Sequence, residues 1–141
     1  MCKPRYLKKA EDMLDYHERR NTKFLDKYFK KYTGWKYSVK TTPWCAAFVN
    51  ALMGECGYPT TGSFMARSFL KWGKKVSKPK MGDVVVFSRG RPPSGHVAFY
   101  LRNYDKNHIV VLGGNQNDEV CMKVYKKSRI LGYRRPVKEN K

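Results

Sequence analysis

The stretch TTPWCAAFVNALMGEC, residues 41–56, decides the fold class of this chain. Two threonines and a proline precede an apolar run with helical spacing, so the stretch predicts a helix with Thr42 as its N-cap and Pro43 in its first position. Cys45 then lies in the first turn, where free backbone N–H groups and the positive end of the helix dipole should lower the pKa of the thiol. The apolar face continues through Phe48, Ala51 and Leu52.

Helical and extended patterns occupy different parts of this chain of 141 residues, a length that fits one domain. Helical spacing covers residues 6–32, where Asn21 or Thr22 can begin a second helix that stops before Gly34, and a short third helix is expected over 63–72. The β-rich runs follow, separated by turn-forming segments: 84–88, 96–102, 108–113 and, more weakly, 121–125. Helices followed by a meander predict an α+β fold with an antiparallel sheet.

Charge is the most unusual property of the composition. The 30 Lys and Arg residues against 11 Asp and Glu give a net charge of +19, which predicts a polyanionic partner such as an anionic cell-envelope polymer, a lipid surface or nucleic acid. Residues 41–66 contain no Lys or Arg, so we expect the basic surface to flank the cysteine helix without entering it. A basic nucleic-acid-binding protein without enzymatic activity is therefore one alternative, but no nucleic-acid motif appears and we expect no specific nucleic-acid partner.

The sequence contains no apolar run of the length of a signal peptide or a transmembrane segment. If the protein works outside the cytoplasm, we therefore expect another factor to deliver it. The four cysteines, Cys2, Cys45, Cys56 and Cys121, form no CxxC pair and show no regular spacing. This pattern argues against a zinc site and against a disulfide framework, so reduced thiols are expected.

Cys45 has two interpretations. A free cysteine is most often a small buried hydrophobic residue, but two later features favour a nucleophile. His96 opens a predicted strand at the rim of the sheet, where its ring can reach a helix N-terminus and act as a general base; taken alone, it would be a solvated turn residue. The segment LGGNQND, residues 112–118, ends the next strand, so Asn115 or Gln116 can hold the imidazole ring, although an Asn-rich turn would also explain this segment.

Other residues near these motifs have mainly structural interpretations. Gly113 and Gly114 let the backbone approach its neighbours closely. Trp44 is expected to be wall or core more often than a platform for a sugar, yet both Trp44 and Gln116 are candidates for substrate binding. Asp83, in GDVVVF, is expected to be a turn residue that caps or bonds locally.

Six blocks of the sequence together resemble one known family: PWCAAFVN, ARSFLKWG, GDVVVFSRG, GHVAFYL, VLGGNQND and RILGYRRP. They occur in the order found in small peptidoglycan hydrolases of the NlpC and CHAP (cysteine, histidine-dependent amidohydrolase/peptidase) papain-like superfamily, many of which are encoded by phages. The resemblance covers residues 21–136. It implies one catalytic domain over 1–141, with a helical extension at 1–20, a tail at 137–141, and N-terminal helices packed on a small antiparallel sheet.

By position, the resemblance makes Cys45 the nucleophile, His96 the base and Asn115 the third catalytic residue, with Gln116 as the alternative. It implies an amidase or endopeptidase that cleaves an amide bond in the peptide part of peptidoglycan, with no metal or cofactor. The expected role is a phage endolysin or virion-associated lysin, and the alternative is a secreted antibacterial effector with the same chemistry. We expect a monomer that is made in the host cytoplasm and reaches the wall after release by another factor or inside the virion.

Overall fold

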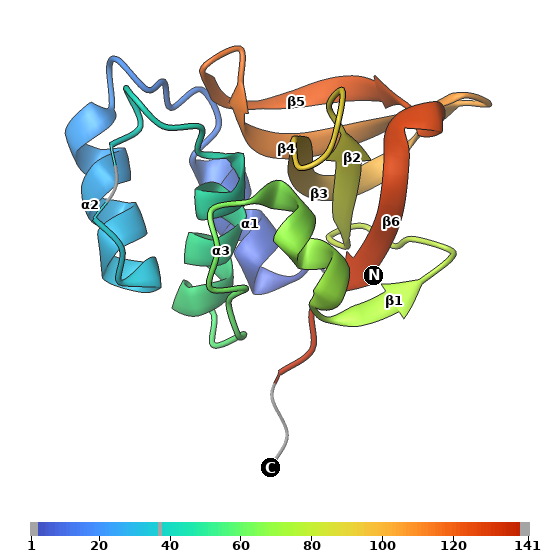
Figure 1. Cartoon of the computed structure of the whole chain (residues 1–141), viewed down its shortest axis with the longest axis horizontal. Coiled ribbons are helices and arrows are strands. Elements are labelled where there is room, and N and C mark those ends of the chain that lie inside the picture. The colour runs from blue at the N-terminus through green and yellow to red at the C-terminus, as the bar shows by residue number, and fades with distance from the viewer. Residues whose placement is uncertain (1–2, 37, 139–141) are drawn as a thin grey trace.

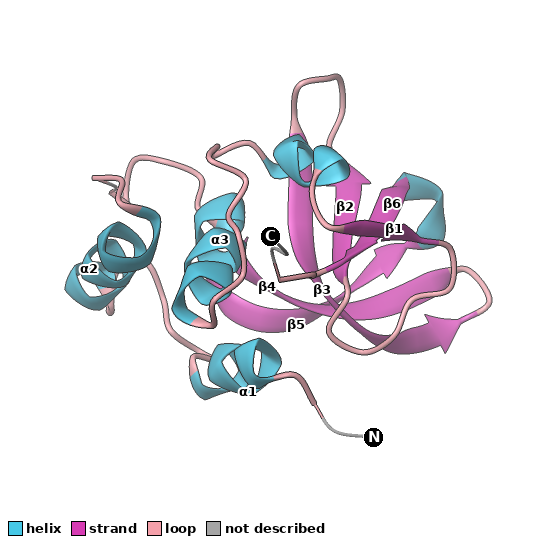
Figure 2. Cartoon of the chain, turned by 90° about the horizontal axis from the view of Figure 1, so that it is seen from below, coloured by secondary structure: helices cyan, strands magenta, loops and turns pink. Residues whose placement is uncertain are grey.

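Three α-helices lie beside a six-stranded antiparallel sheet in the computed structural model, which describes residues 3–36 and 38–138 (Figure 1). The helices are α1 (Arg5–Asp12), α2 (Thr22–Thr33) and α3 (Cys45–Glu55), followed by the short 3₁₀ helix η1 (Ala66–Lys71). The view in Figure 2 shows the helices gathered on one side of the strands. The predicted α+β fold, with N-terminal helices packed on an antiparallel sheet, is confirmed.

The sheet has the strand order β1-β6-β2-β3-β4-β5. Its strands are β1 (Lys74–Val76), β2 (Val84–Ser88), β3 (Gly95–Asp105), β4 (His108–Gln116), β5 (Glu119–Lys126) and β6 (Ile130–Arg135), with the 3₁₀ turn η2 (Lys127–Arg129) before the last strand. The four predicted strands form the meander from β2 to β5, and three of them are longer than predicted. The sequence pattern missed β1 and β6, because β1 is short and mostly exposed and β6 shows no regular alternation of buried and exposed residues.

Both faces of the sheet are buried. Along β3, Val97 and Phe99 point into the core that the sheet shares with α3, whereas Ala98 and Tyr100 belong to a second core on the opposite face. This is the alternation expected of consecutive strand residues. Helix α3 lies at the centre of the first core, and its residues 45–53 are all buried.

Two of the predicted helices have different bounds in the structure. Helix α3 begins at Cys45 with Trp44 as its N-cap, so Thr42 and Pro43 precede the helix instead of capping it. The third helix is confined to Ala66–Lys71 and is of the 3₁₀ type. The second helix ends as predicted, because Gly34 adopts a left-handed conformation directly after it, with φ of 80°.

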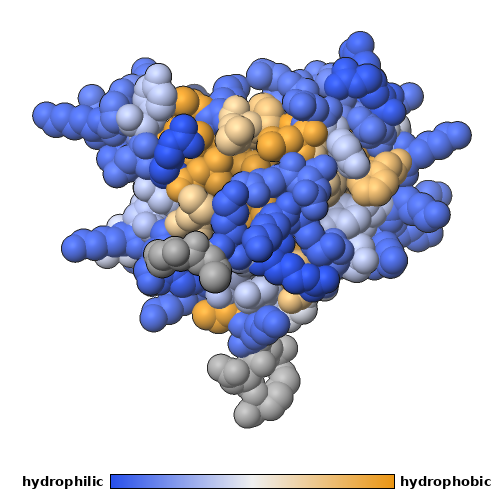
Figure 3. Space-filling view, turned by 180° about the vertical axis from the view of Figure 1, so that it is seen from behind, coloured by the Kyte–Doolittle hydropathy of each residue, from blue (hydrophilic) through white to orange (hydrophobic). Residues whose placement is uncertain are grey.

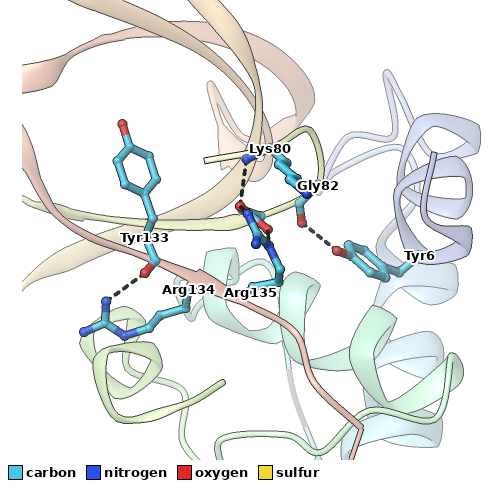
Figure 4. A network of polar contacts seen from close by, with 7 residues as sticks. Tyr6, Lys80, Gly82, Tyr133, Arg134 and Arg135 are labelled. Carbon is cyan, nitrogen blue, oxygen red and sulfur yellow. Dashed lines mark hydrogen bonds and ion pairs between the residues drawn. The ribbon is translucent and has the colours of Figure 1, made fainter. Parts of the chain in front are cut away.

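A buried polar network ties the N-terminal helix and the last strand to the turn before β2 (Figure 4). Asp83 is in that turn, as predicted, and accepts the backbone N–H of Lys80 at 2.8 Å. Its carboxylate also receives two hydrogen bonds from Arg135 of β6, at 2.9 and 2.8 Å. The hydroxyl of Tyr6 in α1 donates to the carbonyl of Gly82 at 2.7 Å, so chain segments far apart in sequence meet at one turn.

Much of the outer surface is hydrophilic. Seen from the side opposite to that of Figure 1, the molecule is covered mainly by hydrophilic side chains, with a larger apolar area near the middle and smaller apolar spots toward the edges (Figure 3). No helix in the part of the chain that the structure describes is long and apolar enough to span a membrane.

Candidate active site

Cys45 is the first residue of α3, and only 5% of it is exposed. Burial raises the pKa of its thiol, which the backbone of Val97, the charge of Arg89 and the N-terminal backbone of α3 lower in part. The prediction of a lowered thiol pKa is therefore wrong for the free site. The helix N-terminus acts in the expected direction, but the cost of placing a thiolate away from water is larger.

His96 is fully buried near the start of β3. Its ring lies beside Phe87 and Tyr125, with ring centroids 6.1 and 5.4 Å away. Burial and the neighbouring Arg89 charge lower the pKa of His96 to about 4, against the opposing effect of the hydrogen bond that the ring makes to Gln116. The ring is therefore neutral at pH 7, as a general base must be.

Gln116 sets the tautomer of this neutral ring. Its amide Nε2 donates to the carbonyl oxygen of Cys121 at 2.7 Å, which turns its Oε1 toward Nε2 of His96 at 2.9 Å. Since an amide oxygen only accepts, Nε2 of His96 carries the proton, and the lone pair is on Nδ1. That Nδ1 is buried and has no hydrogen-bond partner among the described residues. The Cys45 thiol lies close by, because the backbone of the next residue, Val97, forms a hydrogen bond with it and the charge of Cys45 acts on Tyr125, whose ring centroid is 5.4 Å from that of His96.

Two glycines make room for this arrangement, as predicted. A Cβ atom on Gly113 would lie 2.8 Å from Oε1 of Gln116 and 2.9 Å from Cβ of Ala98. One on Gly114 would lie 2.7 Å from the Trp44 ring. All three distances are shorter than an ordinary contact of a carbon atom, so a side chain at either position would displace its neighbours.

The structure brings His96 together with Gln116 and not with Asn115. Asn115 has φ of 57° and forms no hydrogen bond with the ring, whose Nε2 is taken by Gln116 and whose Nδ1 has no partner. The pairing of β4 with β5 shifts between Gly113 and Gln116. Such an irregularity changes which side chains face a given side of the sheet, so alternation along the sequence could not identify the right residue.

The two candidates for substrate binding are buried. Trp44 has no exposed surface, lies against Phe29 and donates from Nε1 to Glu18 at 2.9 Å. Gln116 is 2% exposed, and its amide is engaged by His96 and Cys121. Trp44 therefore lies in the core, the structural alternative given above, and Gln116 lies where it can orient the histidine ring.

A cleft of about 270 Å³ opens at Cys45. Three segments line it: Thr42, Pro43 and Cys45; Phe64, Met65 and Ala66; and Arg89, Pro93, Ser94 and Gly95. Arg89 was missed from the sequence, and it places a basic group in the cleft although the cysteine helix itself has none. The sequence feature that could have identified Arg89 is its position directly after strand β2, because β2 pairs with β3, the strand that carries His96.

Of the remaining cysteines, Cys56 lies at the other end of α3, whereas Cys121 contacts Gln116 behind the histidine. Cys45, Cys56 and Cys121 are free thiols, and Cys2 lies outside the described residues. Among residues 3–36 and 38–138, no three His, Cys, Asp or Glu side chains come together in a way that would hold a metal ion.

Comparisons with known proteins show the family and the fold of this chain. The CHAP domain model matches residues 34–115, which include the cysteine, the histidine and Asn115. A comparison with curated proteins finds no match. Among solved structures, the fold is similar, with a TM-score of 0.50 and 18% sequence identity, to a protein described as similar to lipoprotein, NLP/P60 family, from Staphylococcus aureus subsp. aureus Mu50. The similarity covers 86% of this chain and 42% of that one, so this chain spans less than half the length of its structural relative.

Proposed function

The chain belongs to the CHAP domain family, and we propose that it is a cysteine-dependent peptidoglycan hydrolase that cleaves an amide bond in the peptide part of its substrate. The observation that carries this proposal is the buried, neutral His96. Gln116 is hydrogen-bonded to its Nε2, and its Nδ1 has no partner among the described residues. The backbone of Val97, the next residue in β3, contacts the Cys45 thiol. A purely structural histidine has little reason to leave one buried nitrogen unsatisfied.

The chemistry that follows is acyl transfer in two halves. Nδ1 of His96 takes the thiol proton as the Cys45 sulfur attacks the amide carbonyl, and the oxygen that becomes negative is stabilised by the backbone N–H at the start of α3. The imidazolium then gives its proton to the leaving amine as the carbon–nitrogen bond breaks. In the second half, the ring takes a proton from water, the resulting hydroxide attacks the thioester, and the thiol is restored.

Because the thiol pKa is raised and the histidine is neutral, the free site holds a thiol and an imidazole and not an ion pair. The proton therefore transfers when the substrate is bound, at a time when the substrate covers the cleft. A neutral resting thiol also reacts slowly with oxidants and other electrophiles, which suits an enzyme that meets its substrate outside the cell where it was made.

The wider role that we propose is that of a phage endolysin or virion-associated lysin, in line with the phage proteins that its sequence blocks resemble. A secreted antibacterial effector would use the same chemistry, and neighbouring genes for a holin or for an immunity protein distinguish the two. The net charge of +19 supports a second, electrostatic contact with anionic polymers of the cell envelope.

The test is digestion of purified peptidoglycan, with mass spectrometry of the released fragments to identify the bond that is cut. Cys45→Ser should fold normally and release nothing, because a serine hydroxyl is ionised far less readily than a thiol. Cys56→Ser is the matched control, since Cys56 is also buried, at 7% exposed, but lies at the other end of α3. Near-normal activity of Cys45→Ser, or equal loss in both variants, would contradict the proposal.

A further inference from the structure

Among the described residues, Arg89 is the one basic side chain that lines the cleft with Cys45. It follows the last residue of β2, is exposed, and forms no hydrogen bond or ion pair with the described residues. Its charge acts on the thiol, since it is among the groups that lower the pKa of Cys45. The guanidinium has five N–H donors, and at the edge of a reaction cleft only water or a bound anion can accept hydrogen bonds from them.

Two neighbouring arginines have a structural role at this hairpin, because their guanidinium groups are hydrogen-bonded to its backbone carbonyls. Arg67 donates from Nε to the carbonyl of Ser94 at 2.6 Å, and Arg129 donates to the carbonyl of Ser88 at 3.2 and 3.0 Å. Both guanidinium groups thereby fasten the β2–β3 connection to other parts of the chain. Arg89, in the same region, forms no such hydrogen bond with the described residues.

Much of the cleft lining is apolar. Phe64 and Met65 line it and are 41% and 43% exposed, and the Phe64 ring packs edge-to-face with Trp35, with ring centroids 4.5 Å apart. A ligand here would meet both apolar side chains and a guanidinium. The cleft therefore suits a peptide segment that carries a small apolar group and a carboxylate near the amide bond that reacts.

We propose that Arg89 binds a substrate carboxylate beside the scissile amide, and that the enzyme consequently prefers peptidoglycan stems whose D-glutamate keeps its free α-carboxylate over stems in which this group is a carboxamide. This inference rests on the proposed function. The D-glutamate α-carboxylate is the natural partner because it is attached next to a backbone amide in the stem, whatever the third residue is. Guanidinium and carboxylate form two parallel charge-assisted hydrogen bonds, and a carboxamide offers only one uncharged acceptor.

Arg89 also has an effect on the thiol, and the experiment must separate the two. Loss of the charge should slow reaction at Cys45 with every substrate, whereas loss of a carboxylate contact should slow only the substrate that has the carboxylate. A comparison of two enzymes on two substrates isolates the second effect. The preference of each enzyme is its kcat/KM for the carboxylate substrate divided by that for the carboxamide, and an effect on the thiol that is common to both substrates cancels when the two preferences are compared.

The substrates are two soluble muropeptides that differ only in the α-carboxylate or α-carboxamide of D-glutamate, and the enzymes are the wild type and Arg89→Gln. We expect the wild type to prefer the carboxylate about tenfold in kcat/KM, mainly through KM, since a hydrogen-bonded charge pair of this kind is worth roughly one power of ten. Arg89→Gln should cleave both substrates at similar rates, and Arg89→Lys should keep part of the preference. Arg91→Gln is the matched control, because Arg91 is exposed on the same hairpin but does not line the cleft, and it should keep the full preference.

Two results would overturn the inference. The wild type could cleave both muropeptides equally, or the preference could persist in Arg89→Gln because the substitution slows both substrates by the same factor. Each of these leaves the hydrolase itself intact. If the wild type instead cleaves neither muropeptide nor whole peptidoglycan, the proposed function fails, and this inference fails with it.

Discussion

The side-chain oxygen of Gln116 lies 2.9 Å from Nε2 of His96, in a region where both residues are almost completely buried. The partner is an amide and not a carboxylate, and this difference determines the state of the ring. A carboxylate would favour the imidazolium strongly, whereas the hydrogen bond to a neutral amide raises the pKa by less than burial lowers it, and the pKa of His96 is about 4. Gln116 therefore orients the base without charging it.

Replacing Gln116 should impair catalysis more than replacing Asn115. Gln116→Ala removes the hydrogen bond that sets the ring tautomer, and we expect kcat/KM to fall roughly 10- to 100-fold, the equivalent of the 1–3 kcal/mol that an unsatisfied buried group costs. Asn115→Gly is the control, because glycine tolerates the φ of 57° at that position. Steady-state rates on a soluble muropeptide measure both. A larger loss of kcat/KM in Asn115→Gly would indicate that Asn115, and not Gln116, is the third catalytic residue.

His96 should make the stability of the protein depend on pH. Its pKa is lowered from 6.5 to about 4, so the folded state binds a proton less readily than the unfolded state. The stabilisation is complete above about pH 6.5 and is lost as the pH falls toward about 4, and the shift corresponds to about 3 kcal/mol. Urea denaturation at pH 7.5 and 4 should show this extra loss in the wild type and not in His96→Gln. Parallel losses in both proteins would show that His96 is not the group responsible.

A methyl group at position 113 should act on the site through Gln116. Gly113→Ala places a carbon 2.8 Å from Oε1 of Gln116, and we expect roughly a 10- to 100-fold loss of activity as the amide moves off the ring. Adding Ala98→Gly relieves the second contact of that methyl group, at 2.9 Å, and should restore stability but not activity. Recovery of full activity in the double variant would show that the damage came from strain alone.

Gly114→Ala is the matched comparison, since its methyl group meets Trp44 and Phe48 and not Gln116. We expect about 1–3 kcal/mol of lost stability from overpacking in thermal or urea denaturation. Unchanged stability would mean that the loop relaxes without cost.

The basic surface should govern binding to whole sacculi more than it governs the reaction. Raising salt from 0.01 M to 1 M shortens the reach of exposed charges from roughly 30 Å to 3 Å, so binding to sacculi should weaken steeply while turnover of a short soluble stem peptide changes little. Replacing Lys30 and Lys31 in the last turn of α2, or Lys126 and Lys127 where β5 meets η2, by Gln should have the same effect as high salt. Parallel losses on both substrates would place the charge effect in the active site or in folding.

Local patterns in the sequence were sufficient for the fold class and for two of the site residues. The apolar spacing after Pro43 predicts a helix that begins near Cys45, and the alternating run after the PPSG turn predicts a strand that begins near His96. These features depend on neighbours within a few residues, through helix periodicity, strand alternation and turn chemistry. These local features therefore do not depend on how the rest of the chain folds.

The tertiary structure decided what depends on distant contacts. The irregular pairing of β4 with β5 turns Gln116 toward His96 in place of Asn115, and no local pattern contains that register. Burial under the sheet raises the thiol pKa that the helix N-terminus alone would lower, since desolvation depends on everything that excludes water from Cys45. Arg89 enters the cleft only because the β2–β3 hairpin folds over the start of α3, and the sequence by itself does not contain that proximity.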